Sequence, residues 1–279
     1  NKCYYVPLVD KDGYIINDPL IIKINDQKWR ICIADSDVIL FAKGILSTKN
    51  LSAEIYETNI STLAIQGPKS RDLMKKVFGT KIMDLKFFNF DYFKFKETKF
   101  MISKTGFSKQ GGYEIHIENT KAGLDLYDFF IKSGKEFNLK PGCPNAIERI
   151  EGALLSYGND MDIKDNPFEC GLEKYIDLKS NIKFLGKESL QKIKNNGIKK
   201  KLMGVKVDGN HINLVQEEKL INNKKEIIGY LRSAAFSPSF NKIVGLAMIK
   251  SSYANIGNTF KININNEILN GEICNLPFN

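Results

Sequence analysis

The sequence predicts a mixed α+β protein with a small all-β domain at its C-terminal end. Apolar segments with strand alternation and segments with helical spacing follow one another through the first 195 residues. They do so without the regular strand–helix repeat of a doubly wound parallel sheet. From residue 200 onward, short alternating segments are separated by turn residues, with no helical pattern between them. The 279 residues leave room for two or three domains.

The first part of the chain predicts a hairpin, a helix and a strand–turn–helix unit. Apolar β-branched residues on either side of a polar turn predict paired strands at "GYIINDPLIIKI" (13–24) and "KWRICIAD" (28–35). The segment "SDVILFAKGIL" (36–46) has helical spacing and places Gly44 near the end of a helix. The segment "STLAIQGPKSRDLMKKVFG" (61–79) predicts a strand, a Gly-Pro turn and an amphipathic helix.

The middle of the chain predicts a three-stranded meander followed by a helix. Residues 90–118 alternate strongly and are interrupted at the charged "KET" and at the glycine-rich "TGFSKQGG". Residues 121–137 have helical spacing. The basic segment "QKIKNNGIKKK" (191–201) predicts a solvated linker into the all-β domain. Strands are expected there at four segments: 201–208, 226–236, 243–250 and 259–274.

Composition excludes several classes of function. The net charge of +9 is spread along the chain, which argues against a continuous basic surface for binding nucleic acid. No stretch approaches the roughly 20 apolar residues of a membrane span, and the first residues lack the layout of a secretory signal, so we expect a cytoplasmic protein without a membrane partner. The five cysteines are scattered and there are only two histidines, His116 and His211, so no metal site is expected.

Seven segments in order carry a resemblance to a known family. They are "GYIINDPLII", "LAIQGP", "SKTGFSKQGGYEIHI", "RIEGALLSYGNDM", "FLGKESL", "GYLRSAAFSPSFNKIVGLAMI" and a terminal "PF". The chain resembles the folate-dependent aminomethyltransferases typified by the glycine-cleavage T-protein. Within that family it is most similar to the dimethylsulfoniopropionate demethylase subgroup, through "INDP", "CIADSDVILFAKG" and "GNDMDIKDNPFECGLEKY".

The resemblance implies a three-domain cloverleaf that binds tetrahydrofolate. The first, folate-binding domain would comprise 1–54 and 141–195 and would be N-terminally incomplete relative to the family. Residues 55–140 would form a ferredoxin-like second domain, and 196–279 a β-barrel. Similar enzymes are often dimers, so a homodimer is expected.

The resemblance also implies an enzyme that transfers one carbon without a change of redox state. The subgroup moves a methyl group from a sulfonium, a small-molecule donor, to tetrahydrofolate and releases methylmercaptopropionate. One alternative is a glycine-cleavage-type aminomethyltransferase, although Asn145 stands where that family has an arginine, while Arg149 keeps a second one. Another is a non-catalytic folate-binding regulator, whose characteristic "K-G-C-Y-x-G-Q" is absent at "PFECGLEKY".

Two carboxylates are the main site candidates by similarity to the family. Glu114 matches the glutamate that binds the aminopyrimidinone edge of the pterin, and a carboxylate can accept the two parallel N–H bonds that this edge offers. The alternative is a solvent-facing glutamate on a strand edge. Asp18 matches the catalytic aspartate near the reactive ring nitrogen. The alternative for Asp18 is a turn former before Pro19.

Aromatic and basic side chains complete the expected site. Ring faces attract cations by about 0.5–2 kcal/mol. Candidate neighbours of the sulfonium are Tyr4 and Tyr5, which are expected just upstream of Asp18 on the same strand, Phe107 in the glycine-rich loop, and Tyr157. For each of these tyrosines, core packing is the alternative. Expected cofactor contacts are Phe107 and Tyr113, in the same motif as Glu114, and Arg232, for the glutamate tail of folate.

Overall fold

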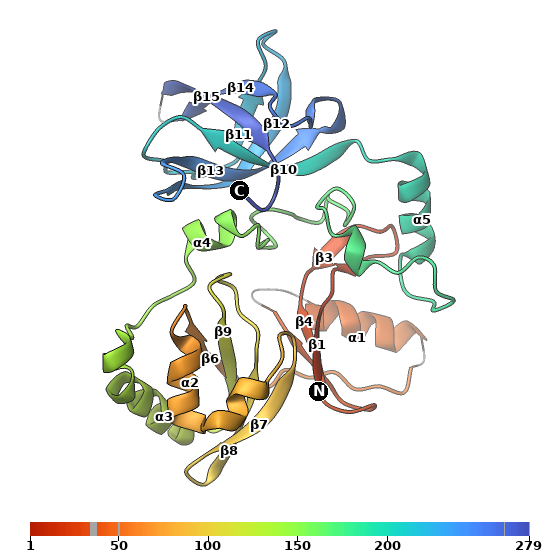
Figure 1. Ribbon diagram of the computed structural model, residues 1–279. Helices are drawn as coiled ribbons and strands as arrows, with labels where there is room; N and C mark the ends of the chain where they lie inside the picture. Colours follow the sequence, from red (N-terminus) through yellow and green to blue (C-terminus); the bar gives the residue numbers. More distant parts are fainter. Residues whose placement is uncertain (34–37, 50, 265, 279) are drawn as a thin grey trace. The chain divides into compact units, whose positions relative to one another are not determined.

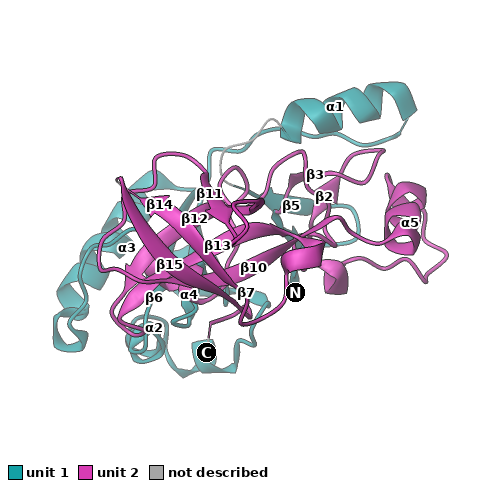
Figure 2. Ribbon diagram, turned by 90° about the horizontal axis from the view of Figure 1, so that it is seen from above, with its two compact units in different colours: residues 1–5, 19–144 teal, residues 6–18, 145–279 magenta. Residues whose placement is uncertain are grey.

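A computed structural model describes residues 1–33, 38–49, 51–264 and 266–278. It confirms the mixed arrangement of helices and strands and the C-terminal β-barrel. Contacts divide the chain into two compact units (Figure 2): unit 1 comprises 1–5 and 19–144, and unit 2 comprises 6–18 and 145–279. The predicted first domain, 1–54 with 141–195, is therefore divided between the two units.

Unit 1 is built around a four-stranded antiparallel sheet with strand order β6-β9-β8-β7 (Figure 1). The meander predicted at 90–118 is confirmed as three of these strands. Two helices, α2 and α3, pack on one face, because Leu73, Met74, Leu126 and Phe130 join the core made by that face. The element bounds are β6 (Ser61–Gln66), α2 (Ser70–Phe78), β7 (Phe90–Phe95), β8 (Thr98–Ser103), β9 (Gly112–Ile117) and α3 (Thr120–Ser133).

A smaller sheet of unit 1 packs against the other face of the large one. Its order is β1-β4-β5, with bounds Lys2–Tyr5, Leu20–Lys23 and Trp29–Cys32. Cys3 and Ile22 form a buried cluster with Phe90 and Met101 of the large sheet. Helix α1 (Val38–Lys49) continues past Gly44, and the expected helix start at 36–37 lies outside the described residues.

The predicted hairpin is confirmed for β4 and β5, but its first strand is shorter than expected. β4 pairs with β5 from Leu20 opposite Cys32 to Lys23 opposite Trp29. The segment 13–24 breaks at Asp18-Pro19, and β3 (Ile15–Asn17) instead pairs with β2 (Leu8–Val9) in unit 2. Proline has no N–H for a strand ladder. The Asp18 N–H also bonds the Asn17 side chain, at 2.7 Å, instead of a neighbouring strand.

The solvated linker predicted at 191–201 is largely wrong, because unit 2 has a helix there. Residues 187–196 form helix α5 (Lys187–Asn196), so most of the basic segment is helical. Helix α5 has an apolar face that its many lysines conceal in the sequence. Leu190 is fully buried, and Leu190 and Ile193 both pack over Gly13. A shorter helix, α4 (Ala146–Glu151), starts at Asn145, whose side chain accepts the Ile147 N–H at 2.8 Å.

The barrel of unit 2 is a closed six-stranded sheet with order β10-β13-β12-β11-β14-β15 (Figure 1). The predicted segments at 201–208, 226–236 and 243–250 are confirmed as strands, and the one at 259–274 forms two paired strands, β14 and β15. β11 was not predicted, because its four residues, "EKLI", are too few and too charged for a clear strand pattern. Among the described residues, no helix is long and apolar enough to cross a membrane. The bounds are β10 (Lys200–Val207), β11 (Glu218–Ile221), β12 (Ile227–Ser237), β13 (Lys242–Lys250), β14 (Thr259–Ile264) and β15 (Glu267–Cys274).

Candidate functional site

Glu114 lies on a central strand of unit 1. In β9 it pairs with Ala64 of β6 on one side and with Ser103 of β8 on the other. The side chain is half-buried and shares a face with His116, opposite the helix-covered face, because side chains alternate along a strand. Glu114 is therefore not the solvent-facing edge residue that was the alternative interpretation.

Three buried polar side chains lead away from the Glu114 carboxylate. The Thr105 hydroxyl donates to Glu114 Oε2. Ser103 Oγ lies 2.7 Å from Thr105 Oγ1 and 3.2 Å from His116 Nε2. Ser103, Thr105 and His116 are at most 4% exposed. These partners are not evident from the sequence, because they meet only through the pairing of β8 with β9.

The glycine-rich loop before β9 is fastened by Gln66 from the "LAIQGP" segment. The Gln66 Nε2 donates to the carbonyl oxygens of Thr105 and Tyr113 at 3.2 and 3.3 Å, and its Oε1 accepts from the Ser108 hydroxyl at 2.8 Å. A Cβ added at Gly106 would lie 2.1 Å from Gln66 Oε1. Glycine is required there so that the amide can reach the backbone beside Glu114.

The two aromatic residues of the same motif are placed differently from Glu114. The Tyr113 ring is 1% exposed and packs in the helix-covered core, on the opposite face of β9. A ligand bound by the Glu114 carboxylate would therefore not contact this ring, and the expected cofactor role of Tyr113 is better explained by core packing. Phe107 is 37% exposed in the glycine-rich loop.

Two thiols and one imidazole near Glu114 are kept neutral by burial. Burial raises the pKa of Cys3 to about 12 and that of Cys32 to about 11, so both thiols are protonated at neutral pH. Burial, reinforced by the positive charge of Arg30, lowers the pKa of His116 to about 4, against a weaker opposing effect of Glu118. This corner of unit 1 therefore offers a carboxylate and neutral hydrogen-bonding groups, and no thiolate.

Asp18 belongs to unit 2 and follows β3 directly. It is half-buried, and the preceding Asn17 is 3% exposed. The Nδ2 of Asn17 is buried and has no hydrogen-bond partner among the described residues, which is rare for a buried polar group. One contact fixes the strand before Asp18: the Ile15 N–H donates to the Asp165 carbonyl oxygen at 2.8 Å. Pro19 follows Asp18 and restricts its backbone.

The expected tyrosines do not share one environment. Tyr4 and Tyr5 end β1, which is a separate strand from those that flank Asp18, so their predicted common strand is wrong. Tyr5 shares a face with the buried Cys3, whereas Tyr4 points to the other face and is 42% exposed. Tyr157 lies in unit 2, where burial, with Asp162 and Asp165 nearby, raises the pKa of its hydroxyl.

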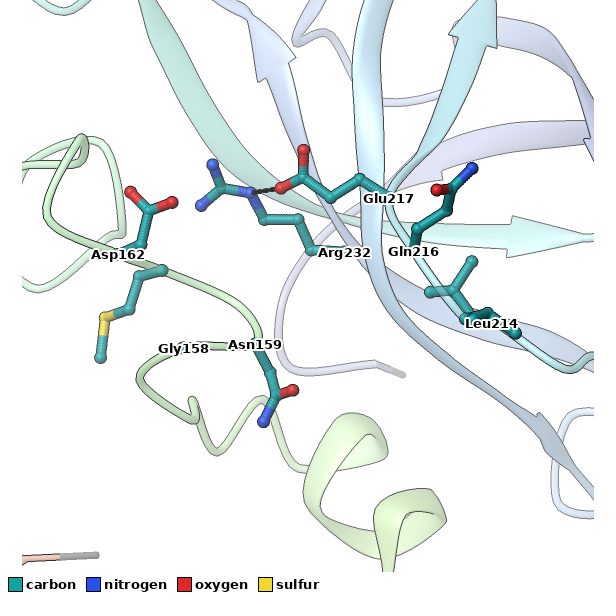
Figure 3. A pocket seen from close by; sticks show the side chains of 9 residues that line it. Gly158, Asn159, Asp162, Leu214, Gln216, Glu217 and Arg232 are labelled. Carbon is teal, nitrogen blue, oxygen red and sulfur yellow. Dashed lines mark ion pairs between the residues drawn. The ribbon is translucent and has the colours of Figure 1, made fainter. Parts of the chain in front are cut away.

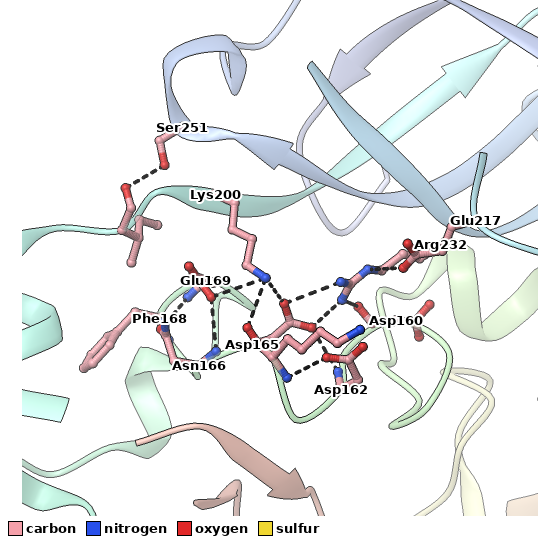
Figure 4. A network of polar contacts seen from close by, with 12 residues as sticks. Asp160, Asp162, Asp165, Asn166, Phe168, Glu169, Lys200, Glu217, Arg232 and Ser251 are labelled. Carbon is pink, nitrogen blue, oxygen red and sulfur yellow. Dashed lines mark hydrogen bonds and ion pairs between the residues drawn. The ribbon is translucent and has the colours of Figure 1, made fainter. Parts of the chain in front are cut away.

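Arg232 is part of a network of buried charges in unit 2 (Figure 4). Its guanidinium contacts the Asp165 carboxylate, which also contacts Lys200, and its Nε lies 2.9 Å from Glu217 Oε1. Burial alone would raise the pKa of the Asp165 carboxyl, but hydrogen bonds from Arg232 and Lys200 outweigh it and lower that pKa. The positive charge of Arg232 is thus already neutralised, which weakens its expected role in binding a glutamate tail.

A polar cavity of about 280 Å³ lies beside this network (Figure 3). Asp162 and Asn159 line it from the loop after Tyr157, and Glu217 and Arg232 line it from the barrel. With two carboxylates and one paired guanidinium, its lining does not favour an anion.

The residues around Glu114 fit the pterin group that the family resemblance implies. Glu114 Oε2 accepts from Thr105, whereas Oε1 accepts no hydrogen bond from any described residue. A carboxylate fixed through one oxygen keeps the other for N–H donors. Glu114 and its partners lie in unit 1, whereas Asp18, Tyr157 and Arg232 lie in unit 2.

Comparisons with known proteins agree with this architecture. Residues 1–180 match the GCVT N-terminal domain, and residues 200–279 match the glycine cleavage T-protein C-terminal barrel domain. The crystal structure of the glycine cleavage system aminomethyltransferase T from Bartonella henselae superposes with a TM-score of 0.85 at 17% identity, covering 100% of this chain and 76% of that one.

Two curated relatives show stronger sequence similarity. The dimethylsulfoniopropionate demethylase DmdA of Ruegeria pomeroyi is 35% identical over 253 residues, which cover 91% of this chain and 69% of that protein. An aminomethyltransferase of Thermoanaerobacter pseudethanolicus is 32% identical over 285 residues, covering 100% of this chain and 76% of that protein. Since both family models match in order over most of the sequence, the chain belongs to the glycine cleavage T-protein family.

Proposed function

We propose that this chain demethylates dimethylsulfoniopropionate, transferring the methyl group to tetrahydrofolate and releasing methylmercaptopropionate. Membership of the T-protein family makes it a folate-dependent enzyme of one-carbon transfer. The observation that carries the proposal is the 35% identity to DmdA over 91% of the chain. The fold and the folate site alone do not determine which molecule donates the one-carbon group.

Glu114 would orient the folate. Its unoccupied Oε1 and the Oε2 fixed by Thr105 give a carboxylate that can accept parallel N–H bonds. The cofactor supplies the nucleophilic ring nitrogen, and the sulfonium sulfur keeps the electron pair of the broken S–CH₃ bond. Because a sulfonium is a good leaving group, alignment of the reacting atoms is most of what the protein must provide.

Asp18 would act beside the reacting atoms. A carboxylate there can accept the proton released from the ring nitrogen or stabilise the sulfonium charge. Its backbone is fixed by Asn17 on one side and by Pro19 on the other, which favours a defined carboxylate position. Tyr157 is the preferred aromatic neighbour for the sulfonium, because it lies in the same compact unit as Asp18.

An aminomethyltransferase is the second candidate, because one such enzyme is 32% identical over 285 residues that cover 100% of this chain. Against it, Asn145 replaces the arginine that the family carries at this position, and its side chain caps α4 as a neutral amide. An enzyme that receives its donor on a lipoylated carrier would lose a cationic contact here.

Product analysis separates the two candidates. The protein is incubated with tetrahydrofolate and either dimethylsulfoniopropionate or an aminomethyl-lipoyl carrier, and the products are identified by mass spectrometry. Demethylation predicts methyltetrahydrofolate and methylmercaptopropionate with the first donor only. Ammonia and methylenetetrahydrofolate with the second donor, and no products with the first, would replace the proposal by the aminomethyltransferase.

A further inference from the structure

The short contacts of the polar chain behind Glu114 favour one direction of hydrogen bonding. Thr105 donates its single hydroxyl hydrogen to the Glu114 carboxylate. Thr105 Oγ1 then accepts from Ser103, 2.7 Å away; the other acceptor near the Ser103 hydroxyl, the Glu114 carbonyl oxygen, is farther, at 3.4 Å. Since the Ser103 hydrogen is used in this way, Ser103 Oγ accepts from His116 Nε2 at 3.2 Å. The chain of donors therefore runs His116, Ser103, Thr105, Glu114.

This direction specifies the tautomer of His116. The imidazole must carry its hydrogen on Nε2, and a neutral ring then leaves Nδ1 bare. Protonation of the ring would keep the Nε2 donor and preserve the direction. All three residues behind the carboxylate are at most 4% exposed, so water does not offer competing partners.

We propose that His116, Ser103 and Thr105 are positioning residues, which form a one-way hydrogen-bond relay that fixes the Glu114 carboxylate for folate. The inference rests on the proposed function, because it assigns the ligand of Glu114. Thr105 occupies Oε2 and restrains rotation of the carboxylate, so that Oε1 faces the ligand without reorganisation. Each relay member contributes by ordering the next and does not itself contact folate.

A purely structural interpretation makes a different prediction. Buried polar groups are normally satisfied whatever their function, so loss of a partner would lower stability without a specific effect on folate. Two measurements other than turnover test the relay. The tautomer of His116 in the free protein tests its direction, and the dissociation constant of tetrahydrofolate distinguishes the two interpretations.

The first measurement is a nitrogen-15 NMR spectrum of the imidazole rings. The chain has two histidines, and the exposed His211 is assigned by comparison with His211→Gln. The relay predicts that His116 has a protonated Nε2 and a bare Nδ1. A hydrogen on Nδ1 in the free protein would overturn the direction of the relay.

The second measurement is anaerobic calorimetric titration with tetrahydrofolate. Thr105→Val keeps the shape but removes the hydroxyl, and we expect the dissociation constant to rise about tenfold. His116→Leu should weaken binding in the same direction, whereas His116→Gln, whose amide can donate from a similar position, should restore affinity to within about threefold. Thr98→Val, at the far end of β8, is the matched control.

Glu114→Gln separates failure of the relay from failure of the proposed function. If Glu114→Gln binds tetrahydrofolate like the wild type, the folate site itself is wrong. If Glu114→Gln loses affinity but Thr105→Val and His116→Leu do not, the site stands and the relay is overturned. Equal losses in His116→Gln and His116→Leu would also overturn it, since a general packing defect would then explain both.

Discussion

Glu114 and Asp18 should affect different steps of the reaction. Glu114→Gln exchanges a carboxylate for an amide that donates where an acceptor is needed, so folate binding should weaken by about 1.5–3 kcal/mol. Asp18→Asn should leave folate affinity within a few-fold and lower turnover, because its charge acts beside the reacting atoms. Titration and steady-state rates measure both. Full turnover in Asp18→Asn would remove its catalytic role.

His116 should make unfolding dependent on pH. Its pKa is about 4 in the folded protein, lowered by burial, against about 6.5 for an exposed imidazole. The unfolded chain therefore binds more protons between these values, and the free energy of unfolding should fall by about 2–3 kcal/mol between pH 7 and pH 4.5.

Urea unfolding at the two pH values measures this contribution. His116→Gln should show a smaller loss of stability on acidification than the wild type, whereas His211→Gln, at an exposed position, should show the same loss as the wild type. Identical losses in His116→Gln and the wild type would mean that the ring is not held neutral by burial.

The sequence predicted Glu114 as a site residue but not its environment. The motif that contains Glu114 is continuous, whereas its partners are set by the register that places Ser103 opposite Glu114. Gln66 comes from a strand nearly 50 residues earlier. Tyr113 shows the converse: a neighbour in sequence faces the opposite side of the strand and belongs to the core.

At the scale of elements, local patterns predicted pairing better than boundaries. The meander of unit 1 has strong alternation and short turns, so its three strands are where the sequence places them. The strand break at Asp18 and helix α5 were missed for physical reasons. A proline interrupts the ladder in the first case, and a short apolar face buried over Gly13 stabilises the basic helix in the second.

Gly186 precedes helix α5 in the left-handed region, with φ of +80° and ψ of −2°, so alanine there meets a backbone cost of about 1–2 kcal/mol. Gly186→Ala would also place a Cβ 2.3 Å from the Asp10 carbonyl oxygen. Thermal unfolding should therefore show a loss clearly larger than this backbone cost alone. A loss within the backbone cost would contradict the close packing of α5 on the loop at Asp10.

The buried ion pairs should stabilise the attachment of α4 to the barrel. Asp160 is fully buried, lies 2.8 Å from Arg149 of α4 and accepts from Ser233 of β12. Asp160→Ala would leave Arg149 unpaired, and we expect a loss of about 3–5 kcal/mol in unfolding free energy. The control Asp208→Ala breaks an exposed pair with Lys242 and should cost at most about 1 kcal/mol. Similar losses of unfolding free energy in Asp160→Ala and Asp208→Ala would contradict the claim that burial makes the Asp160 pair the more important of the two.

At the scale of the whole molecule, the family was recognisable from the order of motifs. Seven weak segments in sequence specified the T-protein architecture, and the closed barrel and the structural similarity agree with it. The compact units could not be predicted from local patterns, because residues 6–18 join the C-terminal half through long-range contacts. The donor is not encoded in the fold, since demethylase and aminomethyltransferase relatives are similarly close.

Isotope transfer tests the central claim most directly. Dimethylsulfoniopropionate with deuterated S-methyl groups is incubated with the wild-type protein and tetrahydrofolate, and the masses of both products are measured by mass spectrometry. We predict one intact CD₃ group on methyltetrahydrofolate and one on methylmercaptopropionate, in equal amounts, with both products reduced in Asp18→Asn. If tetrahydrofolate binds but acquires no CD₃ group, the chain keeps its place in the family, and its assignment as a sulfonium demethylase is wrong.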